Sequence, residues 1–175
     1  ILIIRYNMKY YQKNFCRLCK STNIECQLSL TPTPPADSYV KKNDLNKTQD
    51  LIPLNLFLCN DCGHTQLSHV IDAEEVYLNY IYETESTLGL GSHFQNCAHD
   101  IVQSFNPKKG GLVVDIGSND GILLSFFKNL EMNTLGVDPM PGIAEKANQR
   151  GIETISDFFN LDLAHKIIKD YETPA

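Results

Sequence analysis

Between residues 111 and 170, short apolar runs alternate with segments of helical periodicity. Three runs predict strands and three segments predict amphipathic helices. In chain order these are strand 112–116, helix 122–130, strand 134–137, helix 142–149, strand 152–155 and helix 161–169. Strands that alternate with helices over short connections are typical of a parallel sheet. We therefore expect an α/β fold whose sheet domain, residues 111–175, holds only three strands.

The chain before the predicted sheet divides into two further regions. Residues 8–70 are rich in Cys, Pro and Asn and predict a small separate domain, with Thr31–Pro35 extended and turn-like. Residues 71–110 bridge the two domains, and within them the stretch 92–105 has the apolar spacing of one helix face. Residues 1–7 precede a more conventional start at Met8, and we interpret them as an upstream extension.

Composition excludes several classes of partner. The chain has 175 residues, 42% of them hydrophobic, which is ordinary for a folded globular protein. A net charge of −6 argues against a nucleic-acid partner, because proteins that bind nucleic acid carry basic surfaces. No stretch reaches the roughly 18 apolar residues of a membrane helix, and Ile1–Ile4 is too short for a signal-peptide core. We expect a cytoplasmic protein without a nucleic-acid or membrane partner.

Four of the six cysteines form two Cys-x-x-Cys pairs, Cys16 with Cys19 and Cys59 with Cys62. Two such pairs can present four thiolates to one tetrahedral ion, and zinc suits that ligand set best. Lys20 follows the first pair and Gly63 follows the second. At each of these positions a turn can direct backbone amides at the sulfurs. With four protein ligands no position is open to water, so the predicted zinc is structural.

Other interpretations of these residues stay open. The thiols can be reduced structural cysteines, or one pair can be a redox pair, and His64 or His69 can replace a cysteine as ligand. The two isolated cysteines, Cys26 and Cys97, are interpreted as small buried hydrophobic side chains.

The strand at 112–116 leads into a glycine-containing turn, Asp115-Ile-Gly-Ser-Asn-Asp-Gly121. In open α/β folds, ligands bind at the carboxyl edge of the sheet, where this turn lies. A dinucleotide fingerprint requires glycine at 119 and 122, where this chain has asparagine and isoleucine. A pyrophosphate ligand, and with it a nicotinamide oxidoreductase, is therefore disfavoured.

S-adenosylmethionine fits the turn better because it carries an ammonium group and no phosphate. Asp115 can order the turn or meet the ammonium, and a glycine at 117 allows close approach of the ligand. Asp138 ends the next strand, where a carboxylate can accept the ribose hydroxyls. The predicted cofactor-binding residues are Asp115, Gly117, Ser118, Asn119, Gly121, Asp138 and Pro139. The competing interpretation is an ordinary strand–turn–helix whose glycines serve packing and whose Asn119 or Asp120 caps the helix.

Together these motifs resemble the sugar C-methyltransferase family, in which a zinc domain precedes a Rossmann-like class I methyltransferase domain. The resemblance covers nearly the whole chain. Its motifs are Cys16–Cys19, Pro53-Leu54 to Cys62-Gly63 with Gln66-Leu67, Tyr80-Ile81-Tyr82 with His93-Phe94, 113–121, Gly136–Pro139, Gly151-Ile152 and Asp157–Phe159. It implies methylation at carbon of a nucleotide-linked keto sugar, with S-adenosylmethionine as methyl donor.

The resemblance also implies that Tyr80 and Tyr82 contact substrate or cofactor, and we take them as candidate catalytic residues. Thr84 and Glu85 stand where the family has two serines, so detailed contacts there differ. Without the resemblance, the tyrosines are equally well interpreted as partly buried aromatic side chains.

The family continues through further strands and a second α/β domain, so the resemblance implies that this chain is a truncated, catalytically incomplete form. In the expected strand order, 112–116 is an unpaired apolar edge that invites pairing with another chain. Two alternatives to the enzyme remain: an inactive zinc-containing scaffold, and a zinc-ribbon nucleic-acid binder, which the charge disfavours.

Overall fold

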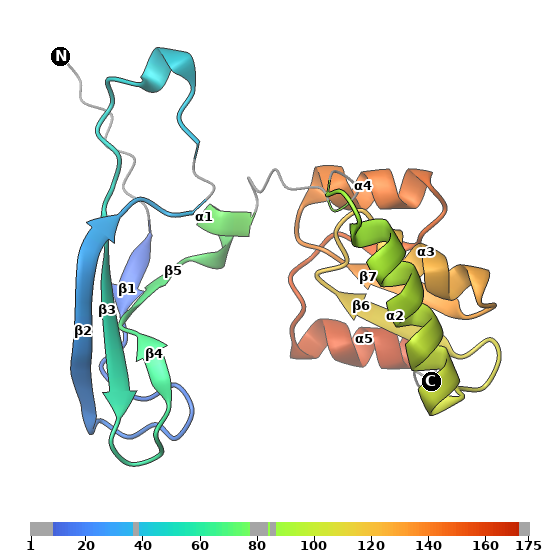
Figure 1. Ribbon diagram of the computed structural model, residues 1–175, viewed down its shortest axis with the longest axis horizontal. Helices are drawn as coiled ribbons and strands as arrows, with labels where there is room; N and C mark the ends of the chain where they lie inside the picture. Colours follow the sequence, from blue (N-terminus) through green and yellow to red (C-terminus); the bar gives the residue numbers. More distant parts are fainter. Residues whose placement is uncertain (1–8, 37–38, 78–83, 85–86, 172–175) are drawn as a thin grey trace. The chain divides into compact units, whose positions relative to one another are not determined.

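The computed structural model describes residues 9–36, 39–77, 84 and 87–171. The chain forms two compact units, Ile1–Tyr77 and Leu78–Ala175. Both sheets of the first unit are antiparallel and the sheet of the second is parallel (Figure 1). The protein is therefore mixed α/β, with a partial Rossmann-like core in the second unit. Among the described residues, no helix combines the length and apolar character that a membrane crossing requires.

The first unit is built from two small sheets. One pairs β1 (Tyr10–Gln12) with β5 (His69–Ile71), and the other has the order β2 (Ile24–Thr33), β3 (Ile52–Cys59), β4 (Thr65–Leu67). Two short helices, η1 (Lys42–Asp44) and α1 (Ala73–Tyr77), complete the unit. Strand β2 includes Thr31–Thr33, which the sequence presented only as an extended turn. It is an edge strand, where proline costs no ladder hydrogen bond.

Few of the described side chains are buried in the first unit. Its buried residues include Cys16, Ile52, Cys59, Gln66 and Ser68, whereas nine of the ten residues of β2 are exposed. A small domain with so few buried apolar side chains is only marginally stabilised by its core. Another constraint must stabilise these sheets.

In the second unit, β6 (Leu112–Ile116), β7 (Asn133–Val137) and β8 (Thr154–Ile155) form a parallel sheet in that order. Helix α5 (Leu161–Tyr171) covers one face through Leu163 and Ile167. The other face carries α2 (Leu90–Phe105), α3 (Ile122–Asn129) and α4 (Pro141–Gln149) (Figure 1). The predicted helices and strands of this region are confirmed, with ends that differ by one or two residues. Strand β6 is, as expected, an edge of the described sheet.

Close packing under the turn depends on a glycine in the central strand. A Cβ atom added to Gly136 of β7 would lie 2.4 Å from Ser118 Oγ, 2.7 Å from Thr154 Oγ1 and 3.0 Å from Ser118 Cβ. These hydroxyls therefore occupy the space that a side chain at 136 would need. Because Gly136 has no side chain, the turn that follows β6 can pack directly against β7.

We predict that Gly136→Ala destabilises the protein by about 1–3 kcal/mol, the usual cost of overpacking a close-packed site. The double variant Gly136→Ala/Ser118→Ala should recover part of the loss, because the closest contact is to Ser118 Oγ. The measurement is urea unfolding. The control is Gly142→Ala in α4, where an added Cβ meets nothing within 4 Å. Equal stability of Gly136→Ala and wild type would contradict this packing.

Candidate functional site

The four paired cysteines converge on one point. Their sulfur atoms all lie within 4.8 Å of one another, with Cys16 and Cys62 at 3.6 Å and Cys19 and Cys59 also at 3.6 Å. A tetrahedral zinc ion with Zn–S bonds of about 2.3 Å separates its sulfurs by about 3.8 Å. The donor set and spacing fit structural zinc, as predicted.

Each Cys-x-x-Cys pair is followed by a residue in the left-handed conformation, Lys20 with φ 67° and Gly63 with φ 74°. This conformation turns the chain so that the amide of Ser21 bonds the Cys19 sulfur and that of His64 bonds the Cys62 sulfur. Hydrogen bonds from the Cys19 and Leu18 amides lower the pKa of the Cys16 thiol to about 6. These backbone hydrogen bonds favour the thiolate, the form that binds metal, whereas burial and the neighbouring thiols raise the pKa of Cys19 and raise that of Cys62 to about 12. The expected turns are confirmed.

Two polar residues that the sequence did not single out as structural hold the two pairs together. Buried Gln66 accepts a hydrogen bond from the Arg17 amide (2.8 Å) and donates one to the Phe15 carbonyl (3.0 Å). Asp61, between Cys59 and Cys62, accepts hydrogen bonds from Ser21 Oγ (2.5 Å) and Asn23 Nδ2 (2.8 Å). These bonds lower the pKa of Asp61. Only tertiary structure reveals them, since the partners are about 40 to 50 residues apart in sequence.

The remaining candidates near the cluster have other positions. His69 lies on β5, and its Nδ1 is 2.8 Å from Ser68 Oγ. Cys26, expected to be buried, is exposed on edge strand β2, so that prediction is wrong. Cys97 is partly buried in α2.

In the second unit, the turn from β6 to α3 is held against the end of β7. The amides of Gly117 and Ser118 both donate to the Val137 carbonyl, at 2.8 and 3.2 Å, and the Asn119 amide donates to Asp138 Oδ2 at 2.9 Å. The Gly121 amide bonds the Ser118 carbonyl at 3.0 Å. Because these amides are satisfied within the protein, they do not form the cradle of free donors that a pyrophosphate needs.

Asp138 is buried, and each of its carboxylate oxygens accepts a hydrogen bond from a backbone amide. Oδ2 takes the Asn119 amide and Oδ1 takes the Met140 amide at 3.0 Å, across Pro139. A carboxylate offers about four lone-pair positions, so two remain for hydroxyl donors of a ligand. The same side chain can therefore fix the turn and bind a diol.

Asp115, at the same edge, has no such partners. Its carboxylate accepts no hydrogen bond from any residue that the structure describes. Burial raises its pKa, and the nearby negative charge of Asp138 raises it further. A partly buried acid with a raised pKa and no hydrogen-bond partner among the described residues is a candidate binding residue.

The two glycines of the turn have different roles. A Cβ atom added to Gly117, which has φ 80°, would meet nothing within 4 Å, so the space beside this residue is open. At Gly121, with φ 76°, an added Cβ would lie 2.9 Å from Ile152 Cγ2, so this glycine serves packing. Ser118 Oγ is buried and has no hydrogen-bond partner among the described residues.

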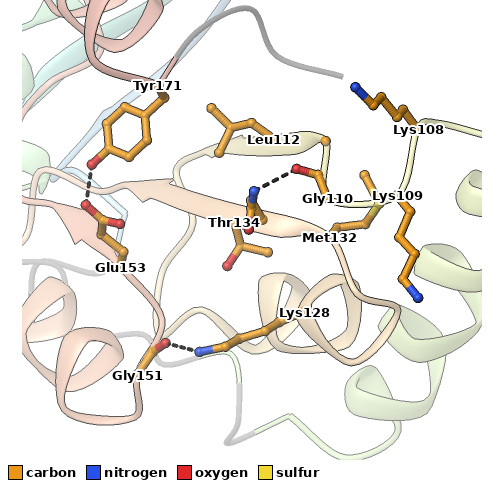
Figure 2. A pocket seen from close by; sticks show the side chains of 12 residues that line it. Lys108, Lys109, Gly110, Leu112, Lys128, Met132, Thr134, Gly151, Glu153 and Tyr171 are labelled. Carbon is orange, nitrogen blue, oxygen red and sulfur yellow. Dashed lines mark hydrogen bonds between the residues drawn. The ribbon is translucent and has the colours of Figure 1, made fainter.

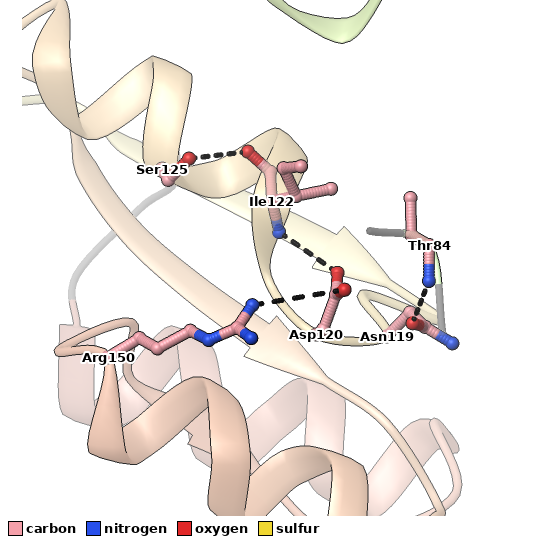
Figure 3. A network of polar contacts seen from close by, with 6 residues as sticks. All are labelled: Thr84, Asn119, Asp120, Ile122, Ser125 and Arg150. Carbon is pink, nitrogen blue, oxygen red and sulfur yellow. Dashed lines mark hydrogen bonds and ion pairs between the residues drawn. The ribbon is translucent and has the colours of Figure 1, made fainter. Parts of the chain in front are cut away.

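Further polar contacts surround the turn in Figure 3. Asp120, 1% exposed, accepts the Ile122 amide at the start of α3 (3.4 Å) and pairs with Arg150 at 4.0 Å. The N-cap residue of α3 is Gly121, so Asp120 accepts this amide from one position before the cap, and neither Asp120 nor Asn119 is the cap residue. The Thr84 amide donates to Asn119 Oδ1 at 2.9 Å, a contact that the sequence did not predict. Tyr80, Tyr82 and Glu85 lie outside the described residues.

A cavity of about 560 Å³ lies at the opposite, amino-terminal edge of the sheet (Figure 2). Its lining includes Leu112, Asn133 and Glu153, which begin or precede the strands whose far ends carry the turn. Its Lys128 amine already donates to the Gly151 carbonyl at 2.6 Å. This cavity is therefore separate from the candidate cofactor site.

Two comparisons with known proteins bear on this chain, one on the cysteine cluster and one on most of its length. Residues 16–77, which include all four clustered cysteines, match the family described as "Putative zinc binding domain". The chain is also 30% identical over 152 residues to the C-methyltransferase NovU of Streptomyces niveus. The alignment covers 87% of this chain and 36% of NovU, so the chain spans about a third of the length of this relative.

We predict that the chain binds one zinc ion and that chelation unfolds the first unit, because zinc–thiolate bonds supply about 10–16 kcal/mol to small zinc folds. Cys59→Ser should lose the metal. Cys26→Ser, at an exposed cysteine outside the cluster, is the control and should retain it. Metal content by mass spectrometry and circular dichroism measure the two effects. Retention of the metal in Cys59→Ser would contradict the assignment.

We predict that Asp115→Asn stabilises the ligand-free chain at neutral pH. A raised pKa in the folded state means that ionisation of Asp115 opposes folding. This penalty is absent below the ordinary aspartate pKa of about 4, grows as the pH rises through that value to the folded pKa, and is complete above it. Thermal unfolding of variant and wild type should therefore differ at pH 7 and converge at low pH. Asp138→Asn, which loses an acceptor of a backbone amide, should destabilise instead.

Proposed function

We propose that the chain is part of a sugar C-methyltransferase and that residues 78–175 bind S-adenosylmethionine for transfer of its methyl group to carbon; the zinc-domain match and the similarity to NovU support this proposal. The observation that carries this proposal is the pair of acids at the carboxyl edge of the sheet. Asp138 keeps two acceptor positions for the ribose hydroxyls, and the carboxylate of Asp115, which has no hydrogen-bond partner among the described residues, is available to the ammonium group.

The turn supports this ligand over a dinucleotide. Its amides are bonded to Val137, Asp138 and Ser118, so it offers little to a pyrophosphate. The open space at Gly117 lets an uncharged part of the ligand approach the backbone. When bound, S-adenosylmethionine supplies an electrophilic methyl group, while the residues of this chain bind and orient it.

The proposed acceptor is a carbon beside the ketone of a nucleotide-linked sugar. Carbon is a poor nucleophile unless a neighbouring carbonyl delocalises the charge left when a proton is removed, and a keto sugar meets this need. Tyr80 and Tyr82 remain the proposed substrate contacts, because a phenol can donate a hydrogen bond to the carbonyl oxygen. NovU, a C-methyltransferase by name, is consistent with reaction at carbon.

A scaffold function is the second candidate. Leu28, Leu30 and Leu67, all more than 40% exposed, lie on β2 and β4 of the first unit, and exposed apolar groups of this kind mark interaction surfaces. The edge of β6, where Ile116 is 57% exposed, is a second position at which we propose that a further strand pairs.

The test is calorimetric titration of the zinc-loaded chain with S-adenosylmethionine and S-adenosylhomocysteine. We expect binding of both and no binding of NAD. Asp115→Asn should weaken S-adenosylmethionine about 10- to 100-fold, the usual effect of losing a hydrogen bond to a charged group.

Gly117→Arg should abolish binding, because the arginine fills the open space beside the turn. Its matched control is Gly110→Arg: Gly110 has a similar positive φ of 76° and equally open surroundings, but lies at the opposite edge of the sheet. The control reproduces the backbone strain without blocking the site. A folded, zinc-loaded chain that binds neither ligand would refute the cofactor proposal and favour the scaffold.

A further inference from the structure

Three segments that are distant in sequence meet at Asn119. Its amide donates to Asp138 Oδ2 at 2.9 Å, and its side-chain oxygen accepts the Thr84 amide at 2.9 Å (Figure 3). Asn119 is therefore the link between the proposed ribose-binding acid and Thr84.

The residue type at 119 is restricted by the backbone. Asn119 has φ 49°, in the left-handed region that glycine and asparagine adopt most readily. Glycine would satisfy the backbone but offers no side-chain acceptor. Aspartate would offer an acceptor, but its charge would add to those of Asp115 and Asp138 nearby. Unlike glycine and aspartate, asparagine combines the left-handed conformation with a neutral acceptor.

Thr84 needs this acceptor because it is only 8% exposed, and a buried amide without a partner is costly. The contact also has consequences further along the chain. The Thr84 carbonyl accepts the Thr87 amide at 3.1 Å, and the Thr87 carbonyl accepts the amide of Leu90, the first residue of α2, at 3.3 Å. Asn119 thus anchors the approach to α2 on the glycine-containing turn.

We propose that Asn119 is a positioning residue that couples occupancy of the cofactor site at Asp138 to the placement of Thr84 and the start of α2. The coupling rests on the proposed function. Hydroxyls bound to Asp138 restrain its carboxylate, which restrains the Asn119 backbone and, through the side chain, the Thr84 amide. By linkage, a well-placed Thr84 strengthens cofactor binding by the same factor.

The experiment measures hydrogen exchange of the Thr84 amide by NMR in the zinc-loaded chain, with and without S-adenosylhomocysteine. In wild type, the ligand should slow this exchange at least about tenfold. In Asn119→Gly, which keeps the left-handed backbone, the Thr84 amide should exchange about 10- to 100-fold faster without ligand, and the slowing by ligand should disappear. Asn119→Asp, which restores an acceptor, should recover part of the protection.

The control is Asn106→Gly, at the second left-handed asparagine among the described residues, which caps α2 at its far end with φ 43°. It should leave Thr84 exchange and its response to ligand unchanged. Wild-type exchange of Thr84 in ligand-free Asn119→Gly would overturn the anchor, and a persisting response to ligand in that variant would overturn the coupling. If wild type binds no ligand, the proposed function fails and the coupling with it, whereas the ligand-free comparison still decides the anchor.

Discussion

The end of β7 is the constraint on which the candidate cofactor site depends. The Val137 carbonyl and the Asp138 carboxylate together accept the amides of Gly117, Ser118, Asn119 and Met140. One strand end thereby fixes the turn after β6 and the start of the segment leading to α4. This arrangement is possible because Gly136 leaves room for the turn to lie directly on the strand. Asp138 also retains acceptor capacity, so the group that organises the edge of the sheet is the same group that can bind a ligand there.

The first unit uses a different kind of constraint. Its sheets bury few side chains, and the two Cys-x-x-Cys pairs come from segments about 40 residues apart. Four thiolates around one ion join these segments as a core would, and Gln66 and Asp61 add hydrogen bonds between the same two loops. The cysteine cluster thus connects distant segments of this unit, whereas in the second unit apolar contacts between helices and sheet connect them.

Asp115 and Asp138, at the carboxyl edge of the sheet, differ in their hydrogen bonding. Asp138 is satisfied by backbone amides, and its removal should cost stability. Asp115 lacks a hydrogen-bond partner among the described residues and has a raised pKa, so its charge opposes folding. Such a residue is available to the ligand that we propose for this edge of the sheet. Function and stability here place opposite demands on two neighbouring carboxylates.

The sequence by itself determined the strand and helix order of the second unit, the four-cysteine cluster and the turns after each pair. These follow from local signals: apolar periodicity, Cys-x-x-Cys spacing and the conformational freedom of glycine. Tertiary structure alone decided that Cys26 is exposed, that Thr31–Thr33 continues a strand, that Gly121 serves packing, and that Asn119 bonds Thr84. Each of these depends on which distant segment lies alongside, and the pattern of a single segment carries no information about its neighbours in space.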